Sequence, residues 1–437
     1  MFGTSGIRGA VGETVTASLG VDLGRAVAAD GAERVVLGRD PRDSGDLLAD
    51  AVAAGLRESG VDVLDLGLAA TPTVARAVGW RNADAGVAVT ASHNPPQDNG
   101  FKLWNPSGQA FTEAQRERIA DRLEDQAFDP AGWDDLGVRT SWPDAADRHV
   151  EAIVDAVDLA DPLSVVVDVG TGAGQVTAEA LEQLDCDVET LNAQPDGSFP
   201  ARPSEPTAEH CEGLARYVGA TDADLGVAHD GDADRTKAVD ATGSFLAGDR
   251  LLALFARDAA SEGERVAIPV DTSLAVEDAL DAVGVGVTRT RVGDVFVAEV
   301  AAEPDVAFGG EPSGAWIWPG ETLCPDGPLA ACKLAALVDE RGPLADQVSD
   351  LPTYPIRRAN VRTEDKRDAM ARVEEALLAE YDDVTTIDGV RVETAEGWFL
   401  VRASGTQPLI RVTAEARDES RADELLETAR GYVEAQT

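Results

Sequence analysis

The chain has 437 residues, 44% of them hydrophobic, which is enough to bury several cores and too many for one ordinary domain. Its formal net charge of −43 argues against partners such as nucleic acid or an anionic membrane. No apolar run reaches the roughly 18 residues of a membrane-spanning helix, and the Gly-rich start at 1–9 does not resemble a signal or transit peptide. The four cysteines form no CxxC pair and the four histidines are scattered, so we expect neither disulfides nor zinc, and a cytoplasmic location.

The acidic excess predicts a protein adapted to high salt. Only four of the cationic residues are lysines, and self-repulsion at a net charge of −43 destabilises a compact chain unless salt screens it. At molar salt the Debye length falls to about 3 Å. We therefore expect a salt-rich cytoplasm, as in halophilic archaea, and a melting temperature that rises as KCl is added. Equal or greater stability at low salt would contradict this expectation.

The first part of the chain alternates apolar β-branched runs with an amphipathic helical pattern. Strands are expected at 35–37, 61–66 and 85–89. A helix is expected over 44–59, with one apolar face made by Leu47, Leu48, Val52 and Leu56. This alternation predicts βαβ units and a largely parallel sheet.

The same pattern restarts twice. Near His149 a helix is followed by a strand at 164–169, and after Gly248 a helix is followed by strands at 266–270 and 305–308. The tail differs: strand, helix over 364–379, several strands and helix over 419–435, which predicts a smaller α+β domain. Two prolines make 349–355 a plausible linker. We expect three similar α/β domains with mixed, largely parallel sheets, at 1–145, 146–247 and 248–350, and a C-terminal α+β domain at 354–437.

Two motifs at predicted strand ends carry candidate chemistry. The segment TASHNP at 90–95 places Ser92 where parallel α/β sheets bind ligands, although a lone loop serine is more often a turn residue. The segment DGDADR at 230–235 also follows an apolar run, and its alternate carboxylates suit Mg²⁺. It resembles the opening of a calcium loop but lacks the sixth-position glycine and twelfth-position glutamate of an EF-hand. Asp230, Asp232 and Asp234 with a phosphoserine oxygen would complete a small Mg²⁺ shell.

Three weaker motifs complete the set. The segment GGEPSG at 309–314 offers Glu311 and Ser313, which suit hydrogen bonds to vicinal sugar hydroxyls. The segment RASGT at 402–406, with Arg411, offers cations, hydroxyls and a Gly-rich backbone for a phosphate. The segment GTGAG at 170–174 looks faintly like a dinucleotide fingerprint, but position 175 is glutamine where the third glycine belongs, so we interpret it as a strand-to-helix turn.

Together the motifs at 90–95, 230–235, 309–314 and 402–406, in this order and spacing, resemble the α-D-phosphohexomutase superfamily. The resemblance extends to FGTSGIRG at 2–9, GRDPR at 38–42 and NGFK at 99–102, and it covers essentially the whole chain. It implies four domains around a central cleft and an enzyme that interconverts hexose 1-phosphate and 6-phosphate. It also implies one Mg²⁺ ion, a hexose 1,6-bisphosphate intermediate and a phosphosugar as the small-molecule partner, in a monomer or homodimer.

The resemblance also implies roles for individual residues. Ser92 matches the phosphorylated serine, which with the three aspartates holds the metal. Glu311 and Ser313 match the sugar-binding loop. The distal phosphate site is matched by Arg402, Ser404, Gly405, Thr406 and Arg411. Lys102 is expected to be the general acid/base, and the residues expected to brace the reacting phosphate are Arg8, Arg39, His93 and, beside the metal loop, Arg235.

Two rivals come from other classes: a catalytically inactive phosphosugar-binding protein and a nucleotide-dependent oxidoreductase built on the 170–174 turn. Intact Ser92 and Lys102 argue against the first, and the second leaves the other motifs without a purpose. Within the mutase class, glucosamine, mannose and glucose phosphates compete as substrates. Ala315 stands where bacterial relatives commonly carry histidine, which should shift proton transfer toward Lys102, and Gln407 stands where they commonly carry glutamate, which should favour dianion binding. Pro312 and Ala315-Trp316 are similar to archaeal phosphoglucosamine mutases, so glucosamine phosphate is the expected substrate.

Overall fold

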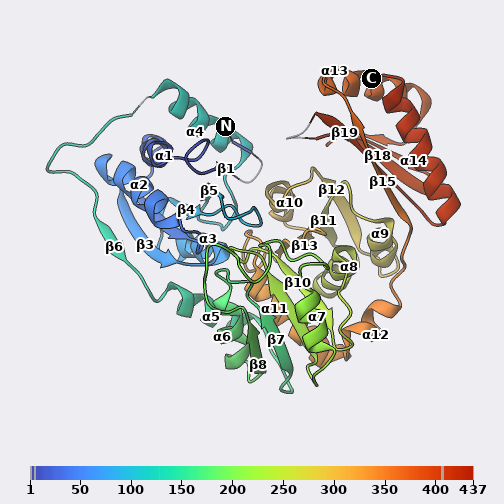
Figure 1. The fold of residues 1–437 in the computed structure, drawn as a ribbon, viewed down its shortest axis with the longest axis horizontal. Helices are drawn as coiled ribbons and strands as arrows, with labels where there is room; N and C mark the ends of the chain where they lie inside the picture. The colour runs from blue at the N-terminus through green and yellow to red at the C-terminus, as the bar shows by residue number, and fades with distance from the viewer. Residues whose placement is uncertain (1, 4–5, 127, 405–407, 437) are drawn as a thin grey trace.

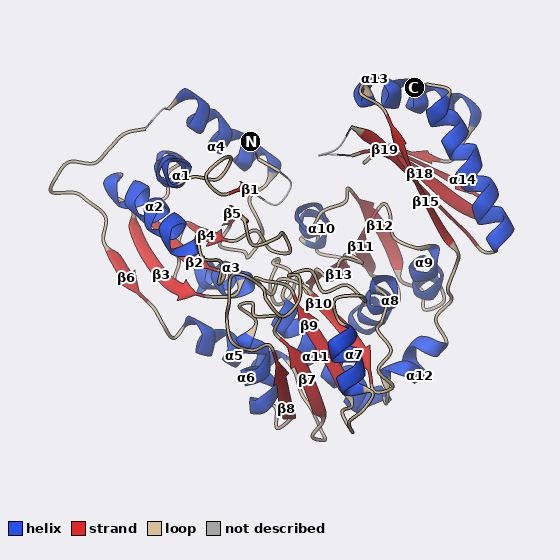
Figure 2. Ribbon diagram, in the orientation of Figure 1, coloured by secondary structure: helices blue, strands red, loops and turns tan. Residues whose placement is uncertain are grey.

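The computed structural model describes residues 2–3, 6–126, 128–404 and 408–436, which form four β-sheets covered by helices (Figures 1 and 2). The sheets follow one another along the chain. In Figure 1 the N-terminal and C-terminal units lie at the two ends of an arc, with the other two units between them. No helix in the described ranges is both long enough and apolar enough to cross a membrane.

The first sheet has the strand order β1-β5-β4-β2-β3-β6 and carries the predicted serine loop. Its inner strands run parallel, whereas β5 is antiparallel to both β1 and β4. The strands are β1 (Ile7–Ala10), β2 (Arg34–Arg39), β3 (Asp62–Leu68), β4 (Ala85–Val89), β5 (Asp98–Trp104) and β6 (Arg139–Ser141). The helices are α1 (Ala17–Ala29), α2 (Gly45–Glu58), α3 (Thr71–Trp80) and α4 (Glu113–Asp125).

The second and third sheets repeat a simpler pattern, with three parallel strands and one antiparallel edge strand each. The second, in the order β10-β9-β7-β8, contains β7 (Ser164–Asp168), β8 (Asp187–Leu191), β9 (Leu225–His229) and β10 (Thr236–Asp240), with α5 (Ala145–Ala156), α6 (Gln175–Gln183) and α7 (Glu212–Val218). The third, in the order β12-β11-β13-β14, contains β11 (Arg265–Pro269), β12 (Gly286–Thr290), β13 (Val306–Gly310) and β14 (Trp316–Ile317), with α8 (Gly248–Ala259), α9 (Leu274–Asp281), α10 (Asp294–Ala301), α11 (Gly327–Arg341) and α12 (Leu344–Ser349).

These two middle units share one hydrophobic core. The helix α11 follows the third sheet in sequence, yet it packs against α5, α6 and the strands β9 and β10 of the second unit. Its apolar residues Leu329, Leu334 and Leu337 are buried in a cluster that includes residues of both sheets. The loops predicted to bind the metal, at 230–235, and the sugar, at 309–314, therefore lie on one continuous packed body.

The fourth sheet is antiparallel, in the order β15-β19-β18-β17-β16. Its strands are β15 (Ile356–Arg362), β16 (Val384–Thr385), β17 (Val390–Thr394), β18 (Gly397–Ala403) and β19 (Leu409–Ala416). The helices α13 (Lys366–Glu380) and α14 (Glu419–Glu434) contact this sheet, and α14 packs across β15, β18 and β19. This is the α+β domain that the tail pattern predicts, and the three α/β units before it confirm the expected fold class.

Most predicted elements are confirmed to within a few residues, but one predicted side-chain position is wrong. Leu47, expected on the apolar face of the second helix, is 58% exposed, whereas Leu48, Val52 and Leu56 are fully buried. The buried three recur every fourth residue, which is the α-helical stripe, and Leu47 lies about 100° away from it. Strand β5, which follows directly after the serine loop, was not anticipated.

Candidate active site

The predicted serine loop leaves the first sheet at the end of β4, and Ser92 is held there in a strained backbone. Its φ is +52°, in the left-handed region that non-glycine residues rarely adopt and that costs roughly 1–2 kcal/mol. The Ser92 amide donates to Thr90 Oγ1 at 2.8 Å, and Thr90 donates to Asp40 at 2.7 Å. This conformation turns the Ser92 hydroxyl toward the second unit, where Oγ donates to Asp230 Oδ2 at 2.6 Å.

The aspartate loop leaves the second sheet at the end of β9 and meets the serine loop directly. Asp230, Asp232 and Asp234 are buried, and one carboxylate oxygen from each lies within 4.8 Å of the others. Close approach of the two loops requires glycine at position 231, because a Cβ there would lie 3.0 Å from the Ser92 carbonyl oxygen and 2.8 Å from Ser204 Oγ. The structure therefore brings together Ser92 and the three aspartates that the sequence singled out.

Asp232 is oriented by groups from the first unit. Thr71, the first residue of α3, donates its hydroxyl to Asp232 Oδ2 at 2.6 Å and its amide to the Asp232 carbonyl at 2.9 Å. Lys102, on β5, donates to the same Oδ2 at 2.8 Å and also to Asp234 Oδ2. Burial opposes the charge on Lys102, but the carboxylates of Asp232 and Asp234 outweigh it and raise the Lys102 pKa above its ordinary value.

The donor set of this cluster fits a small hard cation. The remaining oxygens, Oδ1 of Asp232 and Oδ1 of Asp234, are buried and have no hydrogen-bond partner among the described residues. Burial and mutual repulsion raise the pKa values of Asp230 and Asp234, whereas Lys102 overcomes burial to keep the pKa of Asp232 below its usual range. Buried carboxylates that repel one another and point unpaired oxygens inward are suited to coordinating a divalent ion through oxygen.

The predicted sugar loop at 309–314 begins in the last two residues of β13 and is joined to the aspartate loop by backbone bonds. The Thr236 amide donates to the Gly314 carbonyl at 3.0 Å, and Arg235 pairs with Ala315 in an isolated bridge. Glu311 is buried; its Oε1 accepts the Gly293 amide at 2.7 Å and its Oε2 accepts the Ser313 hydroxyl at 3.1 Å. Glu311 and Ser313 therefore contact one another on a loop that is bonded to the aspartate loop.

Burial, helped by the nearby Asp294 carboxylate, raises the pKa of Glu311 to about 7. The folded protein therefore holds this proton at pH values where the unfolded chain, with an ordinary glutamate pKa, has lost it. Folding stability is then lost as the pH rises through about 7. We expect Glu311→Gln to stabilise the fold by roughly 2–3 kcal/mol above that pH and to have little effect near the ordinary glutamate pKa.

Thermal melts of both proteins at about pH 5 and about pH 8 check this expectation. The effect of the Glu311 proton on stability is the difference between the gains in melting temperature at the two pH values. Glu321→Gln is the matched control, since Glu321 is an exposed glutamate of the same unit. A gain in melting temperature that is the same at both pH values would show that Glu311 titrates normally.

The predicted phosphate site lies on the fourth unit. Arg402 on β18 is directly opposite Arg411 on β19, and like charges in that position destabilise a sheet unless an anion lies between or beside them. Asp388 supplies one such anion, since it accepts from Arg402 Nη1 at 2.9 Å. Both arginines line a cavity of about 330 Å³, together with Arg358 and, from the third unit, Asp271. Lys366 donates to the Ser404 carbonyl. Gly405 and Thr406 lie outside the described residues.

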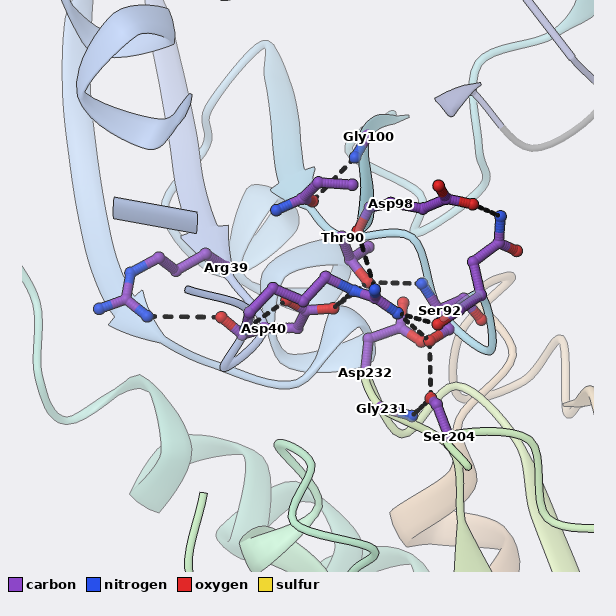
Figure 3. Close-up of polar contacts among 12 residues, drawn as sticks. Arg39, Asp40, Thr90, Ser92, Asp98, Gly100, Ser204, Gly231 and Asp232 are labelled. Atoms are coloured by element: carbon purple, nitrogen blue, oxygen red, sulfur yellow. Dashed lines mark hydrogen bonds and ion pairs between the residues drawn. The ribbon is translucent and has the colours of Figure 1, made fainter. Parts of the chain in front are cut away.

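Four other residues were predicted to brace the reacting phosphate. One of them, Arg235, beside the aspartate loop, has its Nη1 3.8 Å from Glu205 Oε1. Arg8 and His93 each have a buried nitrogen, Nε and Nδ1 respectively, without a partner in the described part of the chain. Burial, with the charges of Arg235, Arg8 and Lys102, lowers the pKa of His93 to about 3, so its imidazole is neutral near pH 7. Arg39 points away from Ser92 (Figure 3); it pairs with Asp46 at 2.6 Å and bonds to the Asp40 carbonyl. The arginine of the GRDPR segment that contacts the serine loop is Arg42, not Arg39.

Three residues at this site were not anticipated: Arg42, Thr71 and Ser204. Ser204 accepts the Gly231 amide at 2.9 Å and donates to the Ser92 carbonyl at 2.8 Å, which ties the two loops together (Figure 3). Arg42 lay within the GRDPR segment, and the Thr71-Pro72 pair is typical of a helix start. Neither the GRDPR segment nor the Thr71-Pro72 pair indicates which distant residues these two side chains contact. The 170–174 glycines form the predicted turn between β7 and α6, and Ala173 donates its amide to the Gly231 carbonyl at 3.0 Å.

The Ser92 hydroxyl bonds into a buried carboxylate cluster, the 309–314 loop is joined to that cluster's loop, and paired arginines line a separate cavity. This is the arrangement that the sequence predicts for an enzyme of the phosphohexomutase class. Known domains described as "Phosphoglucomutase/phosphomannomutase" match in order: alpha/beta/alpha domain I over 1–130, domain II over 147–243, domain III over 247–354 and the C-terminal domain over 359–431. The chain belongs to this family, within the α-D-phosphohexomutase superfamily.

Full-length relatives and solved structures agree with this assignment. A probable phosphoglucosamine mutase of Methanopyrus kandleri is 46% identical over 432 residues, covering 97% of this chain and 95% of that protein. One of Methanothermobacter thermautotrophicus is 45% identical over 443 residues, covering 99% and 98%. A phosphoglucomutase/phosphomannomutase family protein of Burkholderia thailandensis superposes with a TM-score of 0.87 at 28% identity, covering 100% and 98%. The Aspergillus fumigatus N-acetylphosphoglucosamine mutase in complex with GlcNAc-6P and magnesium shares the fold alone, with a TM-score of 0.60 at 16% identity, covering 100% and 95%.

Proposed function

We propose that the protein interconverts glucosamine 1-phosphate and glucosamine 6-phosphate, with Ser92 as the phosphoryl carrier. The observation that carries this proposal is the contact between Ser92 Oγ and Asp230 in a buried group of three aspartates, beside a loop that presents Glu311 and Ser313. The sugar is chosen because relatives above 40% identity are named probable phosphoglucosamine mutases. A phosphomannomutase or phosphoglucomutase activity is the alternative.

The chemistry is a pair of phosphoryl transfers. In the first, the 6-hydroxyl oxygen of a hexose 1-phosphate bonds to the phosphorus of phospho-Ser92 while the bond from phosphorus to Oγ breaks, giving a 1,6-bisphosphate. Lys102 gives a proton to Oγ and recovers the proton that the hydroxyl loses, so protons balance. After the bisphosphate turns over, Ser92 takes back the 1-phosphoryl group and the 6-phosphate is released. In-line placement and neutralisation of charge contribute most of the rate.

The residues fall into four groups by role. Asp230, Asp232 and Asp234, with an oxygen of Ser92, would hold one Mg²⁺, which supplies charge neutralisation at the transferring phosphoryl group. Glu311 and Ser313 would hold sugar hydroxyls. The distal phosphate would be held by Arg402, Ser404, Gly405, Thr406 and Arg411. The cations proposed to attract and brace the reacting phosphate are Arg8 and Arg235, with neutral His93 as a hydrogen-bonding neighbour and Arg39 at longer range.

A substrate panel tests this assignment. The purified protein, with Mg²⁺ and a trace of 1,6-bisphosphate, is assayed on the 1-phosphates of glucosamine, glucose, mannose and ribose, and phosphate on Ser92 is measured by mass spectrometry. We expect phospho-Ser92 and the highest kcat/KM for glucosamine 1-phosphate. A higher kcat/KM for mannose or glucose 1-phosphate would leave the mutase in place and overturn the choice of sugar. An unmodified Ser92 with no turnover of any sugar would favour the phosphosugar-binding protein.

We further propose a salt-rich cytoplasm as the setting and a monomer or homodimer as the working form. The net charge of −43 supports the first. For domain limits we propose 1–145, 146–247, 248–350 and 354–437, each of which contains one of the four sheets.

A further inference from the structure

Arg42 is a fully buried arginine whose two terminal nitrogens both donate to backbone carbonyls of the segment 92–98. Its Nη1 donates to the carbonyls of Pro95 at 2.6 Å and Asp98 at 2.8 Å, and its Nη2 donates to those of Ser92 at 2.8 Å and Asn94 at 2.7 Å. Its Nε donates to Asp40 Oδ2 at 2.9 Å. A guanidinium has five N–H groups, so each one has an acceptor here.

Four backbone carbonyls that converge on one point repel one another unless a cation lies between them. The guanidinium supplies that cation in a planar, fixed geometry that an ammonium group does not reproduce. Residues 92–97 have no regular secondary structure, and Asp98 is the first residue of β5. These bonds therefore fix the direction of the carbonyls in this segment, which we call the 92–98 loop. They include the Ser92 carbonyl itself, which belongs to the residue with φ of +52°.

The second unit closes over Arg42 from the other side. The guanidinium carbon lies 5.0 Å from the centre of the Phe199 ring, within cation–π range. Gly197 packs so tightly on this arginine that a Cβ there would lie 2.5 Å from Arg42 Cα. Ser204, from the same segment, donates to the Ser92 carbonyl that Arg42 also binds (Figure 3). One carbonyl oxygen is thus fixed from two units at once.

We infer that Arg42 is a positioning residue for phosphoryl transfer: its guanidinium organises the carbonyls of the 92–98 loop so that Ser92 keeps its left-handed backbone and its Oγ faces Asp230. This role rests on the proposed function of Ser92 as phosphoryl carrier. Arg42 does not itself touch the sugar loop or the phosphate site of the fourth unit in any described contact. Its effect should therefore fall on the transfer step and spare substrate binding.

Arg42→Lys is the test variant, because an ammonium keeps the charge but has three donors for five acceptors. We expect kcat to fall about 100-fold, the effect of a misplacement of about 1 Å at the reacting atom. KM for the hexose 1-phosphate should stay close to the wild-type value. Hydrogen exchange, followed by mass spectrometry, should become faster in the peptide over 90–101 and not elsewhere. A general loss of stability would instead speed exchange in many peptides.

Arg57→Lys is the matched control. Arg57 lies in the same unit and donates to one backbone carbonyl, that of Gly137, at 3.0 Å. It should change neither kcat nor exchange in the 90–101 peptide. Ser204→Ala is a milder second variant, for use if Arg42→Lys does not fold. It removes the other hydrogen bond to the Ser92 carbonyl and should lower kcat about 10-fold with KM unchanged.

The positioning role alone would be overturned by wild-type kcat in a folded Arg42→Lys enzyme or, if that variant does not fold, by wild-type kcat in Ser204→Ala. A rise in KM with kcat unchanged would also overturn it, because it would place Arg42 in substrate binding. A wild-type enzyme that carries no phosphate on Ser92 and turns over no hexose phosphate overturns the proposed function, and the role of Arg42 with it.

Discussion

Ser92→Ala is expected to lower mutase turnover by about four orders of magnitude or more, the loss seen when a covalent nucleophile is removed. The side chain lost is the one that would carry the phosphoryl group, and no other hydroxyl is oriented toward Asp230 in the described contacts. The fold should survive, because the change removes one hydrogen bond and leaves the backbone contacts of Arg42 and Ser204 to the same residue. A left-handed backbone costs roughly 1–2 kcal/mol for alanine, and the loop already bears that cost with serine, so the change adds no new backbone strain.

The measurement is steady-state turnover with added hexose 1,6-bisphosphate, so that a missing phosphoryl donor does not limit the reaction. Ser198→Ala, an exposed serine of the second unit, is the control and should retain full turnover. Circular dichroism and melting temperature establish that both variants are folded. Near-normal turnover in Ser92→Ala would mean that the phosphoryl group is carried elsewhere.

Asp232→Asn is expected to lower turnover about 100-fold or more and to abolish its dependence on Mg²⁺, because metal charge stabilisation supplies several kcal/mol at such sites. Asp232 Oδ2 accepts from both Thr71 and Lys102, and its Oδ1 is the unpaired oxygen that would face the cation. An amide is neutral and presents an NH₂ group to one of these directions. The change therefore removes the negative charge of one metal ligand. It also places an N–H donor next to the donors of Lys102 and Thr71 or next to the cation, where an acceptor is needed.

Two measurements distinguish an effect of this variant on metal binding from an effect on catalysis. Turnover is titrated with Mg²⁺, and binding of Mn²⁺ as a substitute is followed by electron paramagnetic resonance in the absence of substrate. Asp222→Asn, an exposed aspartate just before β9, is the control for a lost charge in so acidic a chain. Retained activity and unchanged Mn²⁺ binding in Asp232→Asn would place the metal at other residues.

The parts of the site that are predictable from sequence are those set by local position. Ser92 and Asp230 follow buried strands, and the carboxyl ends of strands are where this architecture gathers its functional loops. Periodicity alone predicts individual elements closely, as the bounds of β4 and α2 show, although it does not reveal β5. The resemblance to a known superfamily then assigned roles that no single motif could support.

The contacts that orient these groups were not predictable, because they join segments far apart in the chain. Thr71 and Asp232 are 161 residues apart, and Ser204 and Ser92 are 112 apart. Arg39 and Arg42 stand in the same short motif, and sequence spacing alone could not say which of them turns inward. The choice is made by packing: Arg42 is buried beneath the 92–98 loop, whereas Arg39 reaches the exposed carboxylate of Asp46.

The placement of α11 limits how this enzyme can be dissected. The helix is encoded after the third sheet but supplies apolar cover to the second, through Leu329, Leu334 and Leu337 among others. A fragment that stops near residue 247 would leave the core beneath α6 and β9 open to water, with the aggregation hazard of a large exposed apolar patch. Recombination between related enzymes would have to exchange the second and third units together. The two units that carry the 230–235 and 309–314 loops therefore form one unit of exchange, although they match two separate family domains.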